Sequence, residues 1–350
     1  MRIALDCMGG DRGPEDLVAG AVQAVSEGDL DVILFGDEKK LAAGLKGHGS
    51  ARDAGRIEIV PTTEVVGMDE SPIEAIRRKR DSSIVVAFER FRSGEVDAVV
   101  SAGNSGATMA AAVRSLGRLK KIARPGIASI FPTLKKPVVM MDVGANVDCR
   151  PTHLFQFGLM AAAFSEGIIG NDRPRVGVLS IGEEQGKGNS LVRKTDQLFR
   201  ESTLNYVGNI EASSTFKGDV DVIVCDGFVG NVSLKISEGL AEAMTIMLRD
   251  EINNSLLAKL GYLLSRGAFA RFKKRIDYAE YGGAPLLGLK GTGIICHGRS
   301  SAVAIKNAIF VAAETVHNRV NDRIMELVAE SGDAGDNDSS DHDHIEAGAP

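Results

Sequence analysis

Residues 97–107 read Asp-Ala-Val-Val-Ser-Ala-Gly-Asn-Ser-Gly-Ala: a short apolar run, a glycine-rich polar loop and the start of an alanine-rich segment. The apolar run is typical of a buried strand, and the alanine-rich segment is typical of a helix. Glycine lets backbone N–H groups approach a ligand closely, and a helix N-terminus favours negative charge. The stretch therefore predicts a strand–loop–helix unit that can cradle an oxyanion. A tight turn with a helix cap is the structural alternative.

Four more glycine-rich stretches that carry Asp, Asn or Ser follow apolar runs and precede helix-like segments. They occupy residues 6–11, 142–146, 182–189 and 226–231. Open parallel sheets bind their ligands at the carboxyl ends of the strands. One such loop is weak support, but five in one chain predict an enzyme that holds an anionic, phosphate-bearing substrate.

Strand-like and helix-like segments alternate along the chain. The strand-like runs are mostly continuous Val, Ile and Leu, as in strands that are buried on both faces. This alternation predicts an α/β fold with a doubly wound, mostly parallel sheet and helices on both faces. We expect strands at residues 2–6, 31–35, 57–60, 97–101, 138–142, 175–180, 220–226 and 294–297.

Two segments depart from this alternation. Residues 231 to about 281 form a helical excursion without a strand, which predicts a projection from the sheet or an interface. Residues 331–350 contain six acids and no Lys or Arg, which predicts a disordered acidic tail. Removing six acids from 47 leaves 41 acids against 41 bases, so the rest, a single α/β catalytic domain at residues 1–330, is neutral.

The composition and the spacing of cysteines and glycines exclude several classes of protein. A neutral body with 5% aromatic residues and no Trp argues against nucleic-acid binding. Four Cys without a C-x-x-C pair indicate neither a disulfide framework nor a zinc site, and no acidic cluster specifies another metal. The glycine patterns at 182–189 and 291–293 fail the tests for a nucleotide loop and a dinucleotide fingerprint, so no nicotinamide cofactor is expected. The chain opens on a strand-like run and lacks an apolar run of the ~20 residues that span a membrane, so we expect a cytoplasmic protein.

Three polar residues in these loops have side chains suited to phosphate chemistry. Lys187 can reach phosphate as a point charge, although a solvated loop lysine is the alternative. His297 and Arg299 stand at a further strand-to-helix junction. Histidine there can act as a general acid or base and arginine can grip phosphate with two bonds. A structural histidine with satisfied hydrogen bonds is the alternative.

Taken in order, these loops closely resemble one family, the bacterial phosphate acyltransferases of phospholipid synthesis. The resemblance covers residues 1 to about 328, and seven motifs in the right order make it specific. Two small departures are Cys7, where alanine is frequent, and Ser105, where threonine is frequent; the acidic tail lies outside the pattern. The motifs are Asp-Cys-Met-Gly-Gly-Asp-Arg-Gly-Pro (6–14), Ser-Ala-Gly-Asn-Ser-Gly-Ala (101–107), Met-Asp-Val-Gly-Ala-Asn (141–146), Leu-Ser-Ile-Gly-Glu-Glu-Gln-Gly-Lys-Gly-Asn (179–189), Asp-Gly-Phe-Val-Gly-Asn (226–231), Glu-Tyr-Gly-Gly-Ala-Pro-Leu-Leu-Gly (280–288) and His-Gly-Arg-Ser (297–300).

The resemblance implies transfer of a long-chain fatty acyl group from acyl carrier protein to inorganic phosphate, giving acyl phosphate for phosphatidic acid synthesis. It implies a fold similar to phosphotransacetylases and isopropylmalate dehydrogenase-like enzymes, a homodimer and no organic cofactor. A membrane-bound glycerol-3-phosphate acyltransferase is an implied partner. Two alternatives stay open: a phosphotransacetylase-like enzyme that uses acyl-CoA, and a non-catalytic acyl- or phosphate-binding regulator.

For this chemistry we predict that Lys187 and His297 are catalytic. Lys187 offsets the charge of phosphate, and His297 relays a proton or donates a hydrogen bond to the oxyanion. No metal is predicted. The predicted phosphate-binding residues are Gly103, Asn104, Ser105, Gly106, Asn189, Asn231, Lys235 and Arg299, and Asp6, Asp11, Asn146 and Asp226 are predicted to belong to the surrounding active-site loops.

The helical excursion has one strongly apolar face, and basic residues follow it at positions 266, 271 and 273–275. This pattern is typical of helices that lie on anionic membranes and predicts peripheral association with the inner face of the cell membrane. A helix hairpin in a dimer interface is the alternative. Two basic clusters, at 77–80 and 273–275, could steer an acidic carrier protein or could be ordinary solvated faces. The predicted membrane contacts are Leu256, Leu257, Leu260, Leu263 and Leu264.

Overall fold

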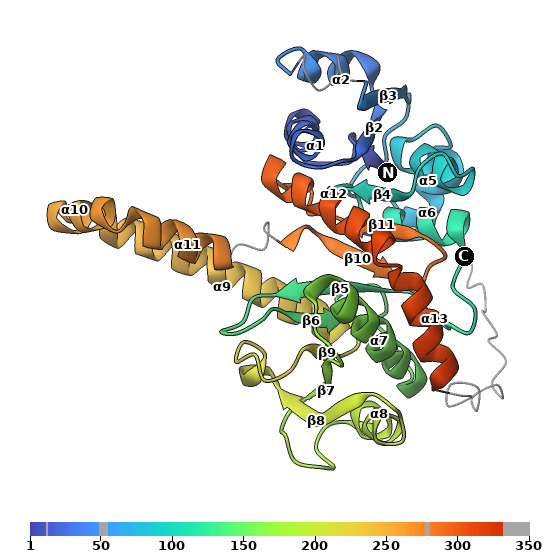
Figure 1. Cartoon of the computed structure of the whole chain (residues 1–350), viewed down its shortest axis with the longest axis vertical. Helices are drawn as coiled ribbons and strands as arrows, with labels where there is room; N and C mark the ends of the chain where they lie inside the picture. The colour runs from blue at the N-terminus through green and yellow to red at the C-terminus, as the bar shows by residue number, and fades with distance from the viewer. Residues whose placement is uncertain (12, 49–54, 277–280, 332–350) are drawn as a thin grey trace, which may run out of the picture.

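The computed structural model describes residues 1–11, 13–48, 55–276 and 281–331. These residues form one eleven-stranded sheet with the order β3-β2-β1-β4-β11-β10-β5-β6-β9-β7-β8, covered by helices on both faces (Figure 1). The predicted doubly wound, mostly parallel α/β fold is confirmed. The strands are β1 (Arg2–Asp6), β2 (Asp31–Gly36), β3 (Ile57–Pro61), β4 (Ala98–Ser101), β5 (Gly126–Phe131), β6 (Val138–Met141), β7 (Arg175–Ser180), β8 (Asn205–Glu211), β9 (Val222–Val224), β10 (Ala284–Leu287) and β11 (Thr292–Ile295).

The eight predicted strands are present with small shifts at their ends, but three strands were missed. β5 and β10 contain glycine, serine or proline within short runs, which weakens the apolar signal. β8 lies at the edge of the sheet, and polar residues and a glycine interrupt its apolar residues, so it lacks the continuous apolar run of a central strand. All three misses therefore have a local cause in the sequence.

The two missed central strands reverse the direction of the sheet. β1, β4 and β11 are parallel to one another. β10 is antiparallel to both β11 and β5, and β5 is antiparallel to β6. β6, β9, β7 and β8 are again mutually parallel, so they run opposite to β1, β4 and β11. The glycine-rich loops after β1 and β4 therefore lie where the strands end on one side of the sheet, and the loops after β6, β7 and β9 lie on the opposite side.

The helices cover the sheet in three buried clusters. Phe88 of α5 and Ala111 of α6 pack on one face of the sheet, and Leu234 of α9 packs against the same cluster. Leu17 of α1 and Ile305 of α12 lie in a second cluster, and α7 and α13 lie in a third. The helices are α1 (Glu15–Glu27), α2 (Glu38–Leu45), α4 (Pro72–Arg78), α5 (Ser83–Arg92), α6 (Ser105–Leu116), α7 (Pro151–Phe164, continued by a π-helical turn Ser165–Ile169), α8 (Ser190–Arg200), α9 (Gly227–Asn253), α10 (Leu256–Leu264), α11 (Arg266–Ile276), α12 (Ala302–His317) and α13 (Val320–Glu330).

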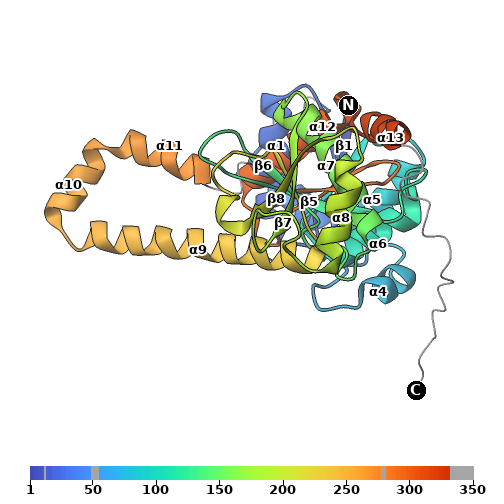
Figure 2. The same cartoon turned by 90° about the horizontal axis from the view of Figure 1, so that it is seen from below.

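Helices α9, α10 and α11 form a helical arm that projects from the body, as predicted (Figures 1 and 2). The arm begins at Gly227 rather than near residue 231, because Asp226 caps α9 directly after β9. At 1.5 Å per residue, α9 is about 40 Å long. No residue of α10 or α11 is buried, and Arg275 Nη2 donates to the carbonyl of Thr133 (3.0 Å) at the base of the arm.

No helix among the described residues is both long and apolar enough to span a bilayer. Residues 277–280 of the predicted excursion (231 to about 281) and residues 332–350 of the predicted disordered tail (331–350) lie outside the described residues.

Candidate active site

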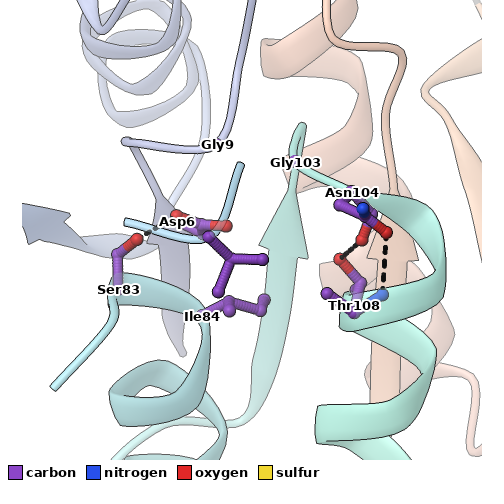
Figure 3. Close-up of a pocket in the computed structure, with 9 residues that line it drawn as sticks. Asp6, Gly9, Ser83, Ile84, Gly103, Asn104 and Thr108 are labelled. Carbon is purple, nitrogen blue, oxygen red and sulfur yellow. Dashed lines mark hydrogen bonds between the residues drawn. The ribbon is translucent and has the colours of Figure 1, made fainter. Parts of the chain in front are cut away.

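Asp6, the last residue of β1, lies buried beneath two glycine-rich loops (Figure 3). Its carboxylate accepts hydrogen bonds from Ser83 Oγ (2.5 Å), Ser101 Oγ (2.7 Å) and the N–H of Met8 (3.2 Å). Burial raises the pKa of Asp6, and these hydrogen bonds oppose that rise. Because these donors come from three different segments of the chain, Asp6 fixes the geometry of the loops above it.

The two loops above Asp6 touch through their backbones. A Cβ atom added to Gly9 would lie 2.4 Å from the Cα atom of Gly103, which no side chain tolerates. The sequence therefore needs glycine at this contact because the loops after β1 and β4 meet there.

Asn104 caps the N-terminus of α6 and also holds the segment before α4. Its Oδ1 accepts from the N–H of Ala107 (3.0 Å), and its Nδ2 donates to the carbonyl of Met68 (2.8 Å). Asn104 therefore caps α6, and both ends of its amide have protein partners. The N–H groups of Ser105 and Gly106 have no acceptor among the described residues. These two donors at a helix N-terminus are free to bind an anion.

His297 follows β11, beside this helix N-terminus. Ile295 is paired with Ser101, and the N–H of Cys296 donates to the carbonyl of Ser101 (2.7 Å). The Nδ1 atom of His297 accepts from the N–H of Arg299 (3.0 Å), so the neutral ring carries its proton on Nε2.

The surroundings of His297 favour the neutral ring. Burial lowers the pKa of this half-buried histidine, and the positive charge of Lys235 lowers it further. Arg299 acts in the same direction, while Glu238 and Asp11 oppose it. A neutral imidazole with Nε2–H is a hydrogen-bond donor at pH 7, suited to a developing oxyanion.

Lys235 of the helical arm and Asp11 of the loop after β1 complete the group of residues around His297. Lys235, in α9, forms an ion pair with Glu238 (Nζ–Oε2, 2.9 Å) and lies close enough to His297 to affect its charge state. The N–H of Asp11 donates to the carbonyl of Gly298 (2.8 Å), which joins the loop after β1 to the loop after β11. The structure thus gathers the loops of Asp6, Asp11, Gly103, Asn104, Ser105, Gly106, His297 and Arg299, with Lys235, at one edge of the sheet.

The loops after β6 and β9 form a second group. Asp142 accepts from the N–H of Asn146 (2.6 Å) and from Asn146 Nδ2 (2.9 Å), so Asn146 orders its own loop. Asp226 caps α9 through the N–H groups of Phe228 (3.0 Å) and Val229 (2.9 Å). Asn231 lies in α9 one turn before Lys235, about 6 Å along the axis. The first turns of α9 therefore connect the two groups of loops.

Lys187 lies in the exposed loop after β7, in the half of the sheet that runs opposite to β11. Its ammonium pairs with no carboxylate among the described residues, and no contact joins it to His297. Asn189 caps α8 by accepting from the N–H of Val192 (2.9 Å). The structure therefore leaves Lys187 free to bind an anion, and Lys187 is not among the charged residues that shift the pKa of His297.

Sequence reasoning missed Ser83 and Glu238. Ser83 Oγ donates a hydrogen bond to Asp6, 77 residues away in the sequence, and Ser83 belongs to none of the seven motifs. Glu238 had one available signal, its i+3 spacing from Lys235 in a helical segment. Among the described residues no group of three or more His, Cys, Asp or Glu side chains is placed to hold a metal ion.

A family model and named relatives match nearly the whole chain. A family model described as "Fatty acid synthesis protein" matches residues 1–323. The phosphate acyltransferase of Syntrophotalea carbinolica is 55% identical over 325 residues, covering 92% of each chain. That of Geobacter sulfurreducens is 54% identical over 327 residues, covering 93% of this chain and 94% of its own.

Solved structures show the same fold at low sequence identity. A phosphotransacetylase from Streptococcus pyogenes has a TM-score of 0.60 at 17% identity and covers 91% of this chain and 94% of its own. A phosphotransacetylase from Staphylococcus aureus has a TM-score of 0.58 at 16% identity and covers 90% of this chain and 94% of its own. The match to the family model and the identities above 50% together decide the assignment. The chain belongs to the fatty acid synthesis protein family, the family of the phosphate acyltransferases.

Proposed function

We propose that this enzyme transfers a long-chain fatty acyl group from the thioester of acyl carrier protein to inorganic phosphate. One observation supports it most directly. The free N–H groups of Ser105 and Gly106 lie at the same end of the parallel strands β4 and β11 as the neutral His297. The first two donors suit a phosphate oxygen, and the His297 Nε2–H suits the oxyanion of a carbonyl under attack.

The reaction needs orientation and charge compensation more than a strong base. A phosphate oxygen of HPO₄²⁻ forms a bond to the thioester carbonyl carbon, the tetrahedral oxyanion collapses, and the C–S bond breaks. The proton of HPO₄²⁻ passes to the leaving thiolate, so acyl phosphate and the free carrier thiol are the products. Arg299 and Lys235 offset the phosphate charge, and His297 donates to the oxyanion. Lys187, free and exposed, is proposed to add positive charge from the loop after β7.

Product formation from the natural substrates tests this function. The purified chain is incubated with long-chain acyl carrier protein, with and without phosphate, and acyl phosphate is trapped as a hydroxamate. Product that depends on both substrates is expected, and its absence would overturn the proposal. Faster turnover of acyl-CoA would favour the phosphotransacetylase-like alternative. Stoichiometric binding without product would favour the regulator.

The helical arm supports two further proposals, a homodimer and a membrane contact. α9 exposes an apolar stripe at helical spacing, which suits pairing with a second copy. α10 exposes all five of its leucines, from 55% at Leu260 to 86% at Leu256. We propose that this tip binds the inner face of the cell membrane, where a membrane-bound glycerol-3-phosphate acyltransferase consumes the lipid-like product. The stripe of α9 comprises Val229, Val232, Ile236, Leu240, Met244 and Met247.

A further inference from the structure

Two basic stretches that are separate in the sequence meet at the C-terminal ends of α4 and α6. Residues 77–80 and 114–124 together contain nine Lys or Arg and no Asp or Glu. Arg114 Nη1 donates to the carbonyl of Ile76 (3.0 Å), which places the first residue of the second stretch beside Arg77. We call the exposed side chains of Arg77, Arg80, Arg114, Arg118 and Lys120 the α4–α6 basic surface.

No carboxylate among residues 1–11, 13–48, 55–276 and 281–331 neutralises the charges of this surface. Arg78 and Lys79 are paired with Glu74 and Glu70. In the described part of the chain, no carboxylate pairs with any of the five residues that define the surface. Within the described residues, Arg114 and Arg118 donate to backbone carbonyls alone, so no carboxylate there compensates their positive charge.

Helix stabilisation accounts for only part of this arrangement. Basic residues in the last turns of α4 and α6 interact favourably with the helix dipoles. Arg118 and Lys120 lie beyond the end of α6, where the dipole effect has faded. Like charges held together repel one another unless an anionic partner binds, so the surface fits an acidic macromolecule.

The surface lies on the two helices that begin at the proposed phosphate site. The start of α4 packs on the start of α6, because a Cβ atom on Gly106 would lie 2.7 Å from Pro72 Cγ. From Gly106 to Arg114 is eight residues, about 12 Å along the helix. A partner bound at the C-terminal ends of α4 and α6 therefore stands about two helical turns from the N–H groups of Ser105 and Gly106.

We infer that the α4–α6 basic surface is the docking site for the acidic acyl carrier protein. This inference rests on the proposed function, because it names the surface that receives the acyl donor. An anionic membrane fits less well: α4 and α6 lie on the opposite side of the body from the α10 tip (Figure 2). A membrane held by that tip leaves the basic surface open to a soluble partner.

Charge reversal tests the docking site. The variant Arg80→Glu plus Lys120→Glu changes one residue in each stretch, and neither side chain has a hydrogen bond in the described structure. Its KM for acyl carrier protein should rise about tenfold or more at low salt, with little change in kcat, and the difference should shrink as salt rises. Arg266→Glu plus Lys273→Glu in the arm is the matched control and should leave this KM unchanged.

Two further measurements separate docking from damage to the site. The KM for phosphate and the turnover of a small acyl-pantetheine thioester, which lacks the protein partner, should stay at the wild-type level in the surface variant. An unchanged KM for acyl carrier protein, or a rise only in the arm control, would overturn the inference. Loss of vesicle binding by the surface variant would instead assign the surface to the membrane. A wild-type enzyme that makes no acyl phosphate contradicts the proposed function, a result distinct from all of these.

Discussion

The Nδ1 atom of His297 accepts a hydrogen bond from the backbone N–H of Arg299 at 3.0 Å. This bond fixes the orientation of the ring and leaves the proton of the neutral imidazole on Nε2. It also ties the histidine to the residue whose guanidinium is proposed to bind phosphate. The loop after β11 therefore positions a hydrogen-bond donor for one substrate and a positive charge for the other.

A donor role for His297 predicts different outcomes for two substitutions. His297→Gln can place an amide N–H near the position of Nε2 and should retain a substantial part of kcat. His297→Ala removes the donor and should lower kcat by roughly 10²-fold or more, as for the loss of one oxyanion donor. Steady-state turnover of acyl carrier protein thioester by both purified, folded variants is the measurement. Equal losses in the two variants would point to proton transfer by the ring instead.

The lowered pKa of His297 predicts the acid limb of the pH profile. Its pKa lies below the ordinary value of 6.5, so the ring is neutral at pH 7 and keeps its role as pH falls through 6.5. When the concentration of HPO₄²⁻ is held constant and saturating, because phosphate itself is protonated in this range, activity should decline only below that value, as the ring becomes charged and its bond to the Arg299 N–H is lost. Stability changes with the same sign: the unfolded state binds the proton more readily, so this contribution falls as pH drops below 6.5. A profile of kcat/KM from pH 5 to 8 that breaks above 6.5 would contradict the assignment.

Asn104 predicts a separable effect on stability and on the site. Asn104→Asp keeps an oxygen for the Ala107 N–H but loses the donor to Met68, whereas Asn104→Ala loses both. Loss of the cap alone costs about 0.5–2 kcal/mol. Denaturant unfolding should therefore show a larger loss for Asn104→Ala than for Asn104→Asp. Both variants should raise the KM for phosphate, because the segment before α4 is released from the start of α6. An unchanged KM in both would remove that segment from the phosphate site.

The sequence predicted the residues of each loop better than the contacts between loops. The capping role of Asn104 and the position of His297 at a strand end both follow from local patterns. The approach of Lys235 to His297 does not, because it depends on the direction in which α9 leaves β9 and crosses the sheet. The reversal at β10 and β5 was equally invisible, since Ala284–Leu287 is short and contains proline. Contacts between distant segments are set by the register and direction of strands, which local composition does not encode.

Substitutions at Lys187 test whether the loop after β7 belongs to the phosphate site. Lys187→Ala should lower kcat by roughly 10²-fold or more if its charge acts on phosphate during the reaction. Lys187→Arg keeps the charge and should recover part of that loss. Kinetics at varied phosphate separate a change in KM from a change in kcat. Near-wild-type values for both variants would exclude the loop after β7 from the site.

The exposed leucines of α10 predict that membrane binding and catalysis can be separated. Each fully buried leucine contributes about 1.5–3 kcal/mol, and each basic residue near an anionic surface adds about 1 kcal/mol. Leu257 and Leu260 are 81% and 55% accessible, so changing them should not disturb the core. Leu257→Glu plus Leu260→Glu should therefore abolish sedimentation with anionic vesicles and leave solution turnover unchanged.

A substitution on α9 supplies the control, because it separates the tip from the proposed dimer face. Ile236→Glu places a charge in the exposed stripe of α9, about 26 Å along the helix from its last residue, Asn253, and so from α10. It should weaken the dimer in light scattering, and each monomer should still bind vesicles through α10, although less firmly because one tip replaces two. If the α10 variant became monomeric and still sedimented with vesicles, α10 would be part of the dimer interface rather than the membrane contact.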